Sequence, residues 1–136
     1  MIDGIISEII EKLSQNGVTS VYSAFDAVSV EKKNRSFFTV VNLSSFELQT
    51  PIFSEFTAFA PYRADIDINI TAPENYQMEK LYNYFSDNIQ PAVMKFSGMN
   101  CSLRKVSIKH DSNINRFVLT ARLSVSGINK FERGSE

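Results

Sequence analysis

Strict alternation of apolar and polar residues between residues 60 and 72 is the strongest constraint on how this sequence can fold. The apolar members include Ala64, Ile66, Ile68 and Ile70, and the polar members are Arg63, Asp65, Asp67, Asn69 and Thr71. A period of two is that of a β-strand with one buried face and one polar face. The sequence therefore predicts a half-buried strand, closed by Pro73, with its isoleucines directed toward the core.

Two other segments have helical periodicity. Residues 2 to 13 place five isoleucines and a leucine on one face, and the following Asn16-Gly17 is typical of a helix C-terminal cap. From about residue 75 to 96 the apolar positions return to the helical spacing. The late Pro91 is expected to kink this second helix.

The remaining apolar segments predict strands. They cover residues 18–25, 36–43, 102–110 and 115–126, with a polar turn at 31–35 and a hairpin turn at 111–113. The order helix, strands, helix, hairpin predicts an α+β fold, with two helices on one face of a mostly antiparallel or mixed sheet. We expect a single domain over residues 1–136, with residues 128–136 as a flexible tail.

Composition narrows the function classes. With 14 basic and 15 acidic side chains, the net charge of −1 gives no general attraction to nucleic acid or to anionic membranes. No apolar run approaches the roughly 20 residues that span a bilayer. The single cysteine and the lack of a signal-peptide pattern at the start favour a reducing cytosol. We therefore expect no membrane partner and no sequence-specific nucleic acid.

Residues that could support catalysis are few. His110 is the only histidine, and its position beside a predicted turn favours a solvated residue over a catalytic base. Cys101 lies nine residues before His110, which corresponds to roughly 30 Å in an extended strand. The two cannot form a nucleophile and base pair, so we predict no catalytic residues and a protein that is not an enzyme.

The paired carboxylates of Asp65 and Asp67 share one predicted strand face and could suggest a metal site. Their neighbours Arg63 and Asn69 fit a solvated or subunit-facing polar stripe better, and no third acidic ligand or histidine lies near them in the sequence. The glycines are scattered and form no phosphate-binding loop. We predict a polar sheet face formed by Arg63, Asp65, Asp67 and Asn69, without a metal or cofactor.

Aromatic residues recur at every third position in the stretch FSEFTAFAPY, residues 53–62. A spacing of three fits neither a strand nor a helix, so one regular element cannot bury all four rings on one face. Surplus apolar surface in this loop-like region favours subunit contact over the alternative, in which the rings pack under one irregular loop into the core of the same chain. The predicted interface residues are Phe46, Ile52, Phe53, Phe59 and Tyr62. Phe56 is expected in the core, because it has the strand parity of Ile52 and Ala58.

The segment TAPENYQMEKLYNYFSDNIQPAV, preceded by ADIDINI and followed by RFVLTARLSVSGI, resembles phage and prophage tail-completion proteins of the tail-terminator type over residues 60–128. The resemblance implies a non-catalytic virion subunit, assembled in the bacterial cytoplasm, that forms a self-associated, commonly sixfold, ring. This ring would cap the tail tube and contact the head connector. Two alternatives remain open: another phage neck, tube or baseplate component, or a small-molecule-binding α+β domain with a pocket lined by the same phenylalanines.

Overall fold

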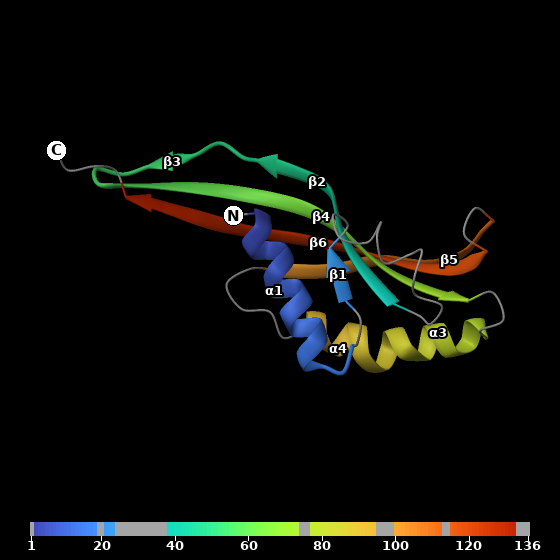
Figure 1. Ribbon diagram of the computed structural model, residues 1–136. Helices are drawn as coiled ribbons and strands as arrows, with labels where there is room; N and C mark the ends of the chain where they lie inside the picture. The colour runs from blue at the N-terminus through green and yellow to red at the C-terminus, as the bar shows by residue number, and fades with distance from the viewer. Residues whose placement is uncertain are drawn as a thin grey trace.

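The computed structural model describes residues 2–18, 21–23, 38–73, 77–94, 100–112 and 115–132. Its elements are α1 (Ile2–Gln15), β1 (Val21–Ser23), β2 (Phe38–Leu48), β3 (Ile52–Phe53), β4 (Thr57–Pro73), α3 (Met78–Tyr84), the π-helical turn η1 (Phe85–Ile89), α4 (Gln90–Val93), β5 (Asn100–Asp111) and β6 (Arg116–Glu132). Figure 1 shows them as one sheet with helices on one side. The predicted polar turn at 31–35 lies outside the described residues.

The sheet has the strand order β1-β2-β4-β6-β5, and β3 pairs with β4. Only the β1–β2 pairing is parallel, while all the others are antiparallel. The predicted α+β fold with helices on one face of a mostly antiparallel, mixed sheet is therefore confirmed. The central pair, β4 and β6, matches along all 17 residues of each strand.

The core lies between the helices and one face of β4 and β6. Ile66, Ile68 and Ile70 are fully buried there, as the alternation predicted, against Ile9 and Leu13 of α1. From the second helical stretch the core takes Leu81, Phe85 and Ile89, and from β6 it takes Leu119, Ala121, Leu123 and Val125. Alternate residues of each strand thus meet one stripe of each helix, which is how an amphipathic sheet and helix bury their apolar surfaces together.

The two helical stretches meet through a side-chain cap. α1 ends as predicted, with Gly17 at a φ of +85° that favours glycine. The amide of Asn88 donates to the carbonyl oxygen of Asn16 at 2.9 Å, so η1 caps the C-terminal end of α1. The π-helical turn η1 directly precedes the short α4, which contains Pro91, the residue at which a kink was expected. A widened turn accommodates the ring and the missing N–H of proline.

The sheet face opposite the helices is less uniform than the sequence predicted. Phe38 is fully buried there, packed edge-to-face against Tyr22 at a centroid distance of 6.2 Å. The buried Arg116 lies over the Phe38 ring at 5.1 Å and donates to the Thr71 carbonyl. At this end of the far face, the cation–π contact and the carbonyl hydrogen bond stabilise the buried guanidinium beside an aromatic pair. The far face therefore combines the buried Phe38 with the polar residues Asp65, Asp67 and Asn69 further along the sheet.

Strands β2, β4, β5 and β6 all extend beyond their predicted ranges. β6 continues through Ile128 to Glu132, so this part of the expected flexible tail is a strand paired with β4. The loop-like region before residue 62 also forms strands, namely the end of β2, then β3 and the start of β4. Together these segments carry the sheet past the helices, as Figure 1 shows at its left side.

Candidate interaction surface

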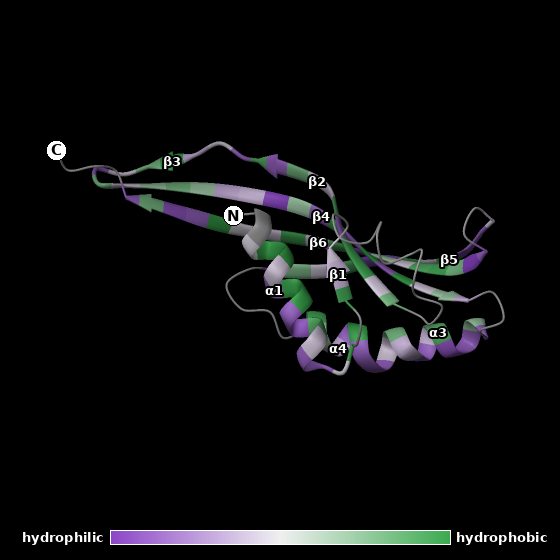
Figure 2. Cartoon of the chain, viewed as in Figure 1, coloured by the Kyte–Doolittle hydropathy of each residue, from purple (hydrophilic) through white to green (hydrophobic). Residues whose placement is uncertain are grey.

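We call the projecting end of the sheet the arm: β3, residues 57–61 of β4 and residues 127–132 of β6. The described part of the chain has nine exposed large hydrophobic residues, and six lie on the arm or at its base. They are Leu48, Ile52, Phe53, Phe56, Ile128 and Phe131. Figure 2 shows the arm extending beyond the helix layer, with apolar colouring on β3 and near the end of β6. Apolar side chains are thus concentrated where no helix covers them.

The two faces of the arm differ in charge. Paired residues in an antiparallel sheet lie on the same face, so the row Phe53–Ala58–Phe131 continues the helix side of the sheet. The next rows on this side are Ala60–Asn129 and Leu48–Tyr62–Gly127. This face therefore carries no charged side chain. The far face carries Glu47, Arg63, Lys130 and Glu132 among its apolar residues.

At the base of the arm, Tyr62 lies across β6 above Gly127. A Cβ atom on Gly127 would lie 2.6 Å from the Tyr62 hydroxyl oxygen and 2.8 Å from Cζ. On its other side Tyr62 stacks on Phe46, with centroids 6.0 Å apart. Burial raises the pKa of Tyr62, with smaller contributions from Cys101 and from Glu8 of α1. The helix layer thus ends close to Tyr62, and the arm begins there.

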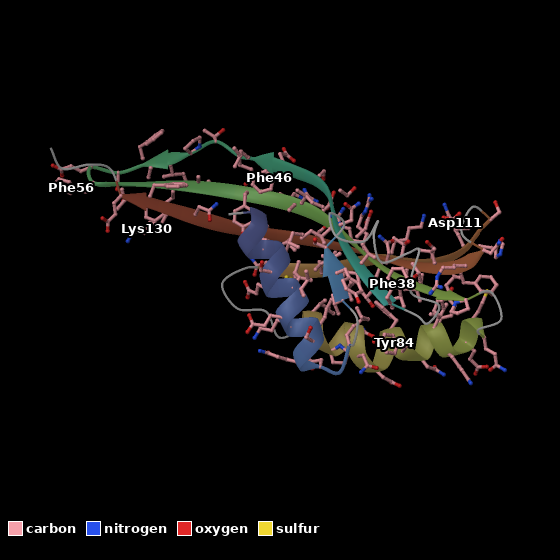
Figure 3. All side chains as sticks on the ribbon, viewed as in Figure 1. Phe38, Phe46, Phe56, Tyr84, Asp111 and Lys130 are labelled. Carbon is pink, nitrogen blue, oxygen red and sulfur yellow. The ribbon has the colours of Figure 1, made fainter. Side chains whose placement is uncertain are left out.

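A tight turn closes the outer end of the arm. The Ser54 amide donates to the Thr57 carbonyl at 2.8 Å, and the two hydroxyl groups are in hydrogen-bond contact. Phe56 sits within this turn and is 61% exposed, so its predicted place in the core is wrong. The turn interrupts the strand, so parity cannot be carried from Ile52 to Ala58. Phe53, not Ile52, pairs with Ala58. Figure 3 labels Phe56 at the tip.

The five predicted interface residues differ in how far their side chains are buried. Ile52 and Phe53 are exposed on the arm, whereas Phe46 and Phe59 are partly buried and Tyr62 is a core residue. Leu48, Ile128 and Phe131 were not predicted. Ile128 and Phe131 belong to a segment of mixed charge whose sequence predicted a flexible tail. Their pairing with β4 places them on the arm.

The predicted polar face forms a ladder of bonds between β4 and β6. Thr120 donates to Asn69 at 2.7 Å, and Arg122 holds Asp67 in a two-point contact at 2.9 and 3.2 Å. Ser124 donates to Asp65 at 2.8 Å and, with Ser45 and Arg122, lowers the pKa of this carboxyl group.

The carboxylates of the ladder are therefore occupied by side-chain donors from neighbouring strands. Arg63, the fourth predicted member of the polar face, is exposed at the base of the arm. Among the described residues, no group of three histidine, cysteine or acidic side chains is placed to hold a metal ion. The contacts observed for Asp65 and Asp67 are those of residues that pair strands.

Cys101 and His110 lie nine residues apart on the extended β5. Burial, followed by the charge of Glu8, raises the pKa of the Cys101 thiol to about 11, which disfavours the nucleophilic thiolate. His110 stands edge-on to Phe117 at 5.4 Å. A depression of about 340 Å³ beside it is lined by Lys109, Asp111, Ser112, Val118 and Thr120. The phenylalanines proposed to line a small-molecule pocket are not among these residues.

No protein-family model and no curated protein matches the chain. Two of the solved structures that resemble it do so at low similarity. One is the crystal structure of the type 4 fimbrial biogenesis protein PilO from Pseudomonas aeruginosa, at 12% identity and a TM-score of 0.35, covering 93% of this chain and 71% of that one. The other is the core region of PilO from the same organism's type IV pilus system, at 11% identity and a TM-score of 0.28, covering 83% and 97%. At these scores the likeness carries no argument about function.

The predicted kinship with phage tail terminators, and the tail-capping function taken from it, is wrong. No family model supports it, and the two solved structures named above are described as a type IV pilus biogenesis protein, not as phage proteins. The segments that suggested it encode an alternating strand, an amphipathic helix and a hairpin, which unrelated α+β domains share. The virion location, the sixfold ring and the tail-tube and head-connector partners depended on this resemblance and lose their support with it.

None of the helices in the described part of the chain is both long enough and apolar enough to cross a membrane.

Proposed function

We propose that this protein is a non-catalytic binding protein and that the arm is the surface through which it binds another protein. The observation that carries the proposal is the concentration of six exposed large apolar side chains on the arm and at its base. Each of the six is more than half exposed. Such groups on a structured surface are favourable only when a partner removes them from water.

The size of this apolar surface supports a protein partner. A fully exposed side chain of this kind offers roughly 200 Å², so six at about 60% exposure present on the order of 700 Å². The largest apolar patch of a typical monomer is about 300–600 Å², and a standard interface buries about 800 Å² per partner. Although the residues are divided between two faces, the arm as a whole offers enough apolar area to bind a protein.

The shape of the arm supports the same proposal. Three strands joined by ladder hydrogen bonds hold the apolar side chains in fixed rows, so little conformational entropy is lost when a partner binds. Aromatic residues are enriched at the energetic centres of interfaces, and three of the six exposed residues are phenylalanines. The arm therefore has both the composition and the rigidity of a binding surface.

In-cell photo-crosslinking tests the proposal. A benzophenone analogue of phenylalanine is placed at Phe53 on the arm, and in a control at Tyr82, an exposed aromatic residue on α3. We expect covalent adducts with protein from the Phe53 position and few from Tyr82. Equal yields from the two positions, or none from Phe53 in a protein that is folded by circular dichroism, would contradict the proposal.

A further inference from the structure

We infer that the helix-side face of the arm packs against the same face of a second copy of this chain. The inference rests on the proposed function and names the partner. It concerns the face formed by the rows Phe53–Ala58–Phe131, Ala60–Asn129 and Leu48–Tyr62–Gly127.

Charge selects this face over the other one. The centres of protein interfaces are depleted in charged residues, and the three rows on the helix side contain none. On the far face, by contrast, Lys130 lies beside Phe59, and Glu132 lies beside Thr57. A partner that covers the helix-side face must itself be uncharged and apolar. A second copy of the chain supplies such a surface.

The rows are also complementary to themselves in size. The outermost row has phenylalanines on both sides of Ala58, and the next row consists of the smaller Ala60 and Asn129. Successive rows on one face of a strand are about 7 Å apart. A two-fold axis between these two rows would place the bulky row of each copy over the small row of the other. Alternating large and small residues let facing layers interdigitate.

The same axis also brings Phe56 and Leu48 into the contact. The arms then run in opposite directions, and Phe56 at the tip of one copy comes to face Leu48 at the base of the other. Every contact occurs twice, as an isologous dimer requires.

The area agrees with a stable dimer. In the rows of this face, Leu48, Phe53 and Phe131 are 63%, 65% and 56% exposed, and Phe56 in the turn at the tip is 61% exposed. At roughly 200 Å² for each full side chain, they offer about 500 Å² of apolar surface. A standard interface buries about 800 Å² per partner, of which somewhat more than half is apolar. The helix-side face and the tip together thus present about as much apolar area as one side of such an interface.

Sedimentation velocity of the full chain from about 1 to about 100 μM tests the inference. We expect a species of twice 15.4 kDa that increases with concentration. Phe131→Glu should weaken association at least about thirtyfold, since it buries a charge at the centre of the contact. The matched control is Ile128→Glu, on the same strand and 61% exposed but on the far face, which should change association less than about threefold.

A third variant distinguishes specific packing of the two faces from non-specific apolar association. Ala60→Leu enlarges the small row, so it should weaken the dimer, whereas non-specific apolar association would stay equal or become stronger. Thermal melts establish that each variant is folded. A wild-type chain that stays monomeric, an unaffected Phe131→Glu dimer, or a strengthened Ala60→Leu dimer would each overturn the inference. If the pure protein is monomeric while Phe53 crosslinks to a different protein in cells, the second copy is excluded and the proposed binding function stands.

Discussion

The close approach of Tyr62 to Gly127 makes a sharp prediction about the junction between the body and the arm. In Gly127→Ala, the new Cβ would lie 2.6 Å from the Tyr62 hydroxyl oxygen and 2.9 Å from Cε1. Carbon atoms do not approach so closely, and the ring cannot simply move aside, because Phe46 stacks on it and the core buries it to 7% exposure. The substitution must therefore displace either the ring or the strand.

The expected magnitude combines two opposing effects. Overpacking a well-packed site costs about 1 to 3 kcal/mol of unfolding free energy. Replacing glycine by alanine in a strand returns roughly 0.5 to 1 kcal/mol, because the unfolded chain loses conformational freedom. We therefore expect Gly127→Ala to lower the unfolding free energy by about 1 to 2 kcal/mol. In a Tyr62→Ala background the clash is absent, so the same substitution should be neutral or slightly stabilising.

Denaturant titration of the wild type, the two single variants and the double variant measures this coupling. All four proteins are compared at the same low protein concentration, so that self-association contributes little to any of the measured unfolding free energies. Gly4→Ala is the matched control, since nothing lies within 4 Å of its new Cβ, and it should stabilise α1 by up to about 1 kcal/mol. Additive effects of the Tyr62 and Gly127 substitutions, within about 0.5 kcal/mol, would refute the proposed contact between ring and glycine.

Two further predictions concern the core and the cysteine. Ile68→Ala, at a fully buried site, should lower the unfolding free energy by about 2 to 5 kcal/mol. The control Ile52→Ala, at an exposed site, should change it by less than about 0.5 kcal/mol. Equal effects of the two substitutions would show that the buried face is misassigned. The Cys101 thiol, whose pKa is raised from 9.0 to about 11, should react with a disulfide reagent at pH 9 far more slowly in the folded than in the denatured protein. The pKa of the Cys101 thiol is higher in the folded than in the unfolded protein, so its contribution to stability is complete below about pH 9 and is lost as the pH rises from 9 toward 11. A Cys101→Ser variant should therefore lose less stability than the wild type over this pH range.

Sequence patterns predicted the body of the protein well and the arm poorly. The alternation around Ile68 has the period of a β-strand, and the isoleucine stripe of α1 has the period of a helix. Each pattern therefore predicted correctly which face is buried. The arm is uncovered by helices, so its strands have no such one-sided pattern: Ile128 and Phe131 face opposite sides of β6 although both are apolar. Their strand character comes from pairing with β4, a tertiary effect that a single segment does not reveal.

The candidate surface depended on the same tertiary information. The period-three spacing of aromatic residues correctly indicated apolar surplus before Tyr62, but the turn at Ser54–Thr57 decided which rings are exposed. Across that turn, odd-numbered residues of β3 share a face with even-numbered residues of β4. Counting alternate residues along the sequence therefore wrongly assigned Phe56 to the core. Tyr62 belongs to the core because glycine opposite it leaves room for the ring, and residue 127 lies 65 positions away in the sequence.

The polar ladder gives the arm its two unlike faces. Between Asn69–Thr120 and Asp65–Ser124, three successive rows lock the register of β4 against β6 before the strands leave the helix layer. A shift of one residue in this register would move the side chains of β6 to the opposite face and place Lys130 and Glu132 on the helix side. Hydrogen bonds on the far face of the body thus determine that the helix-side face of the arm is uncharged. The carboxylates that first suggested a metal site thus fix the alignment of two strands whose ends form the proposed binding surface.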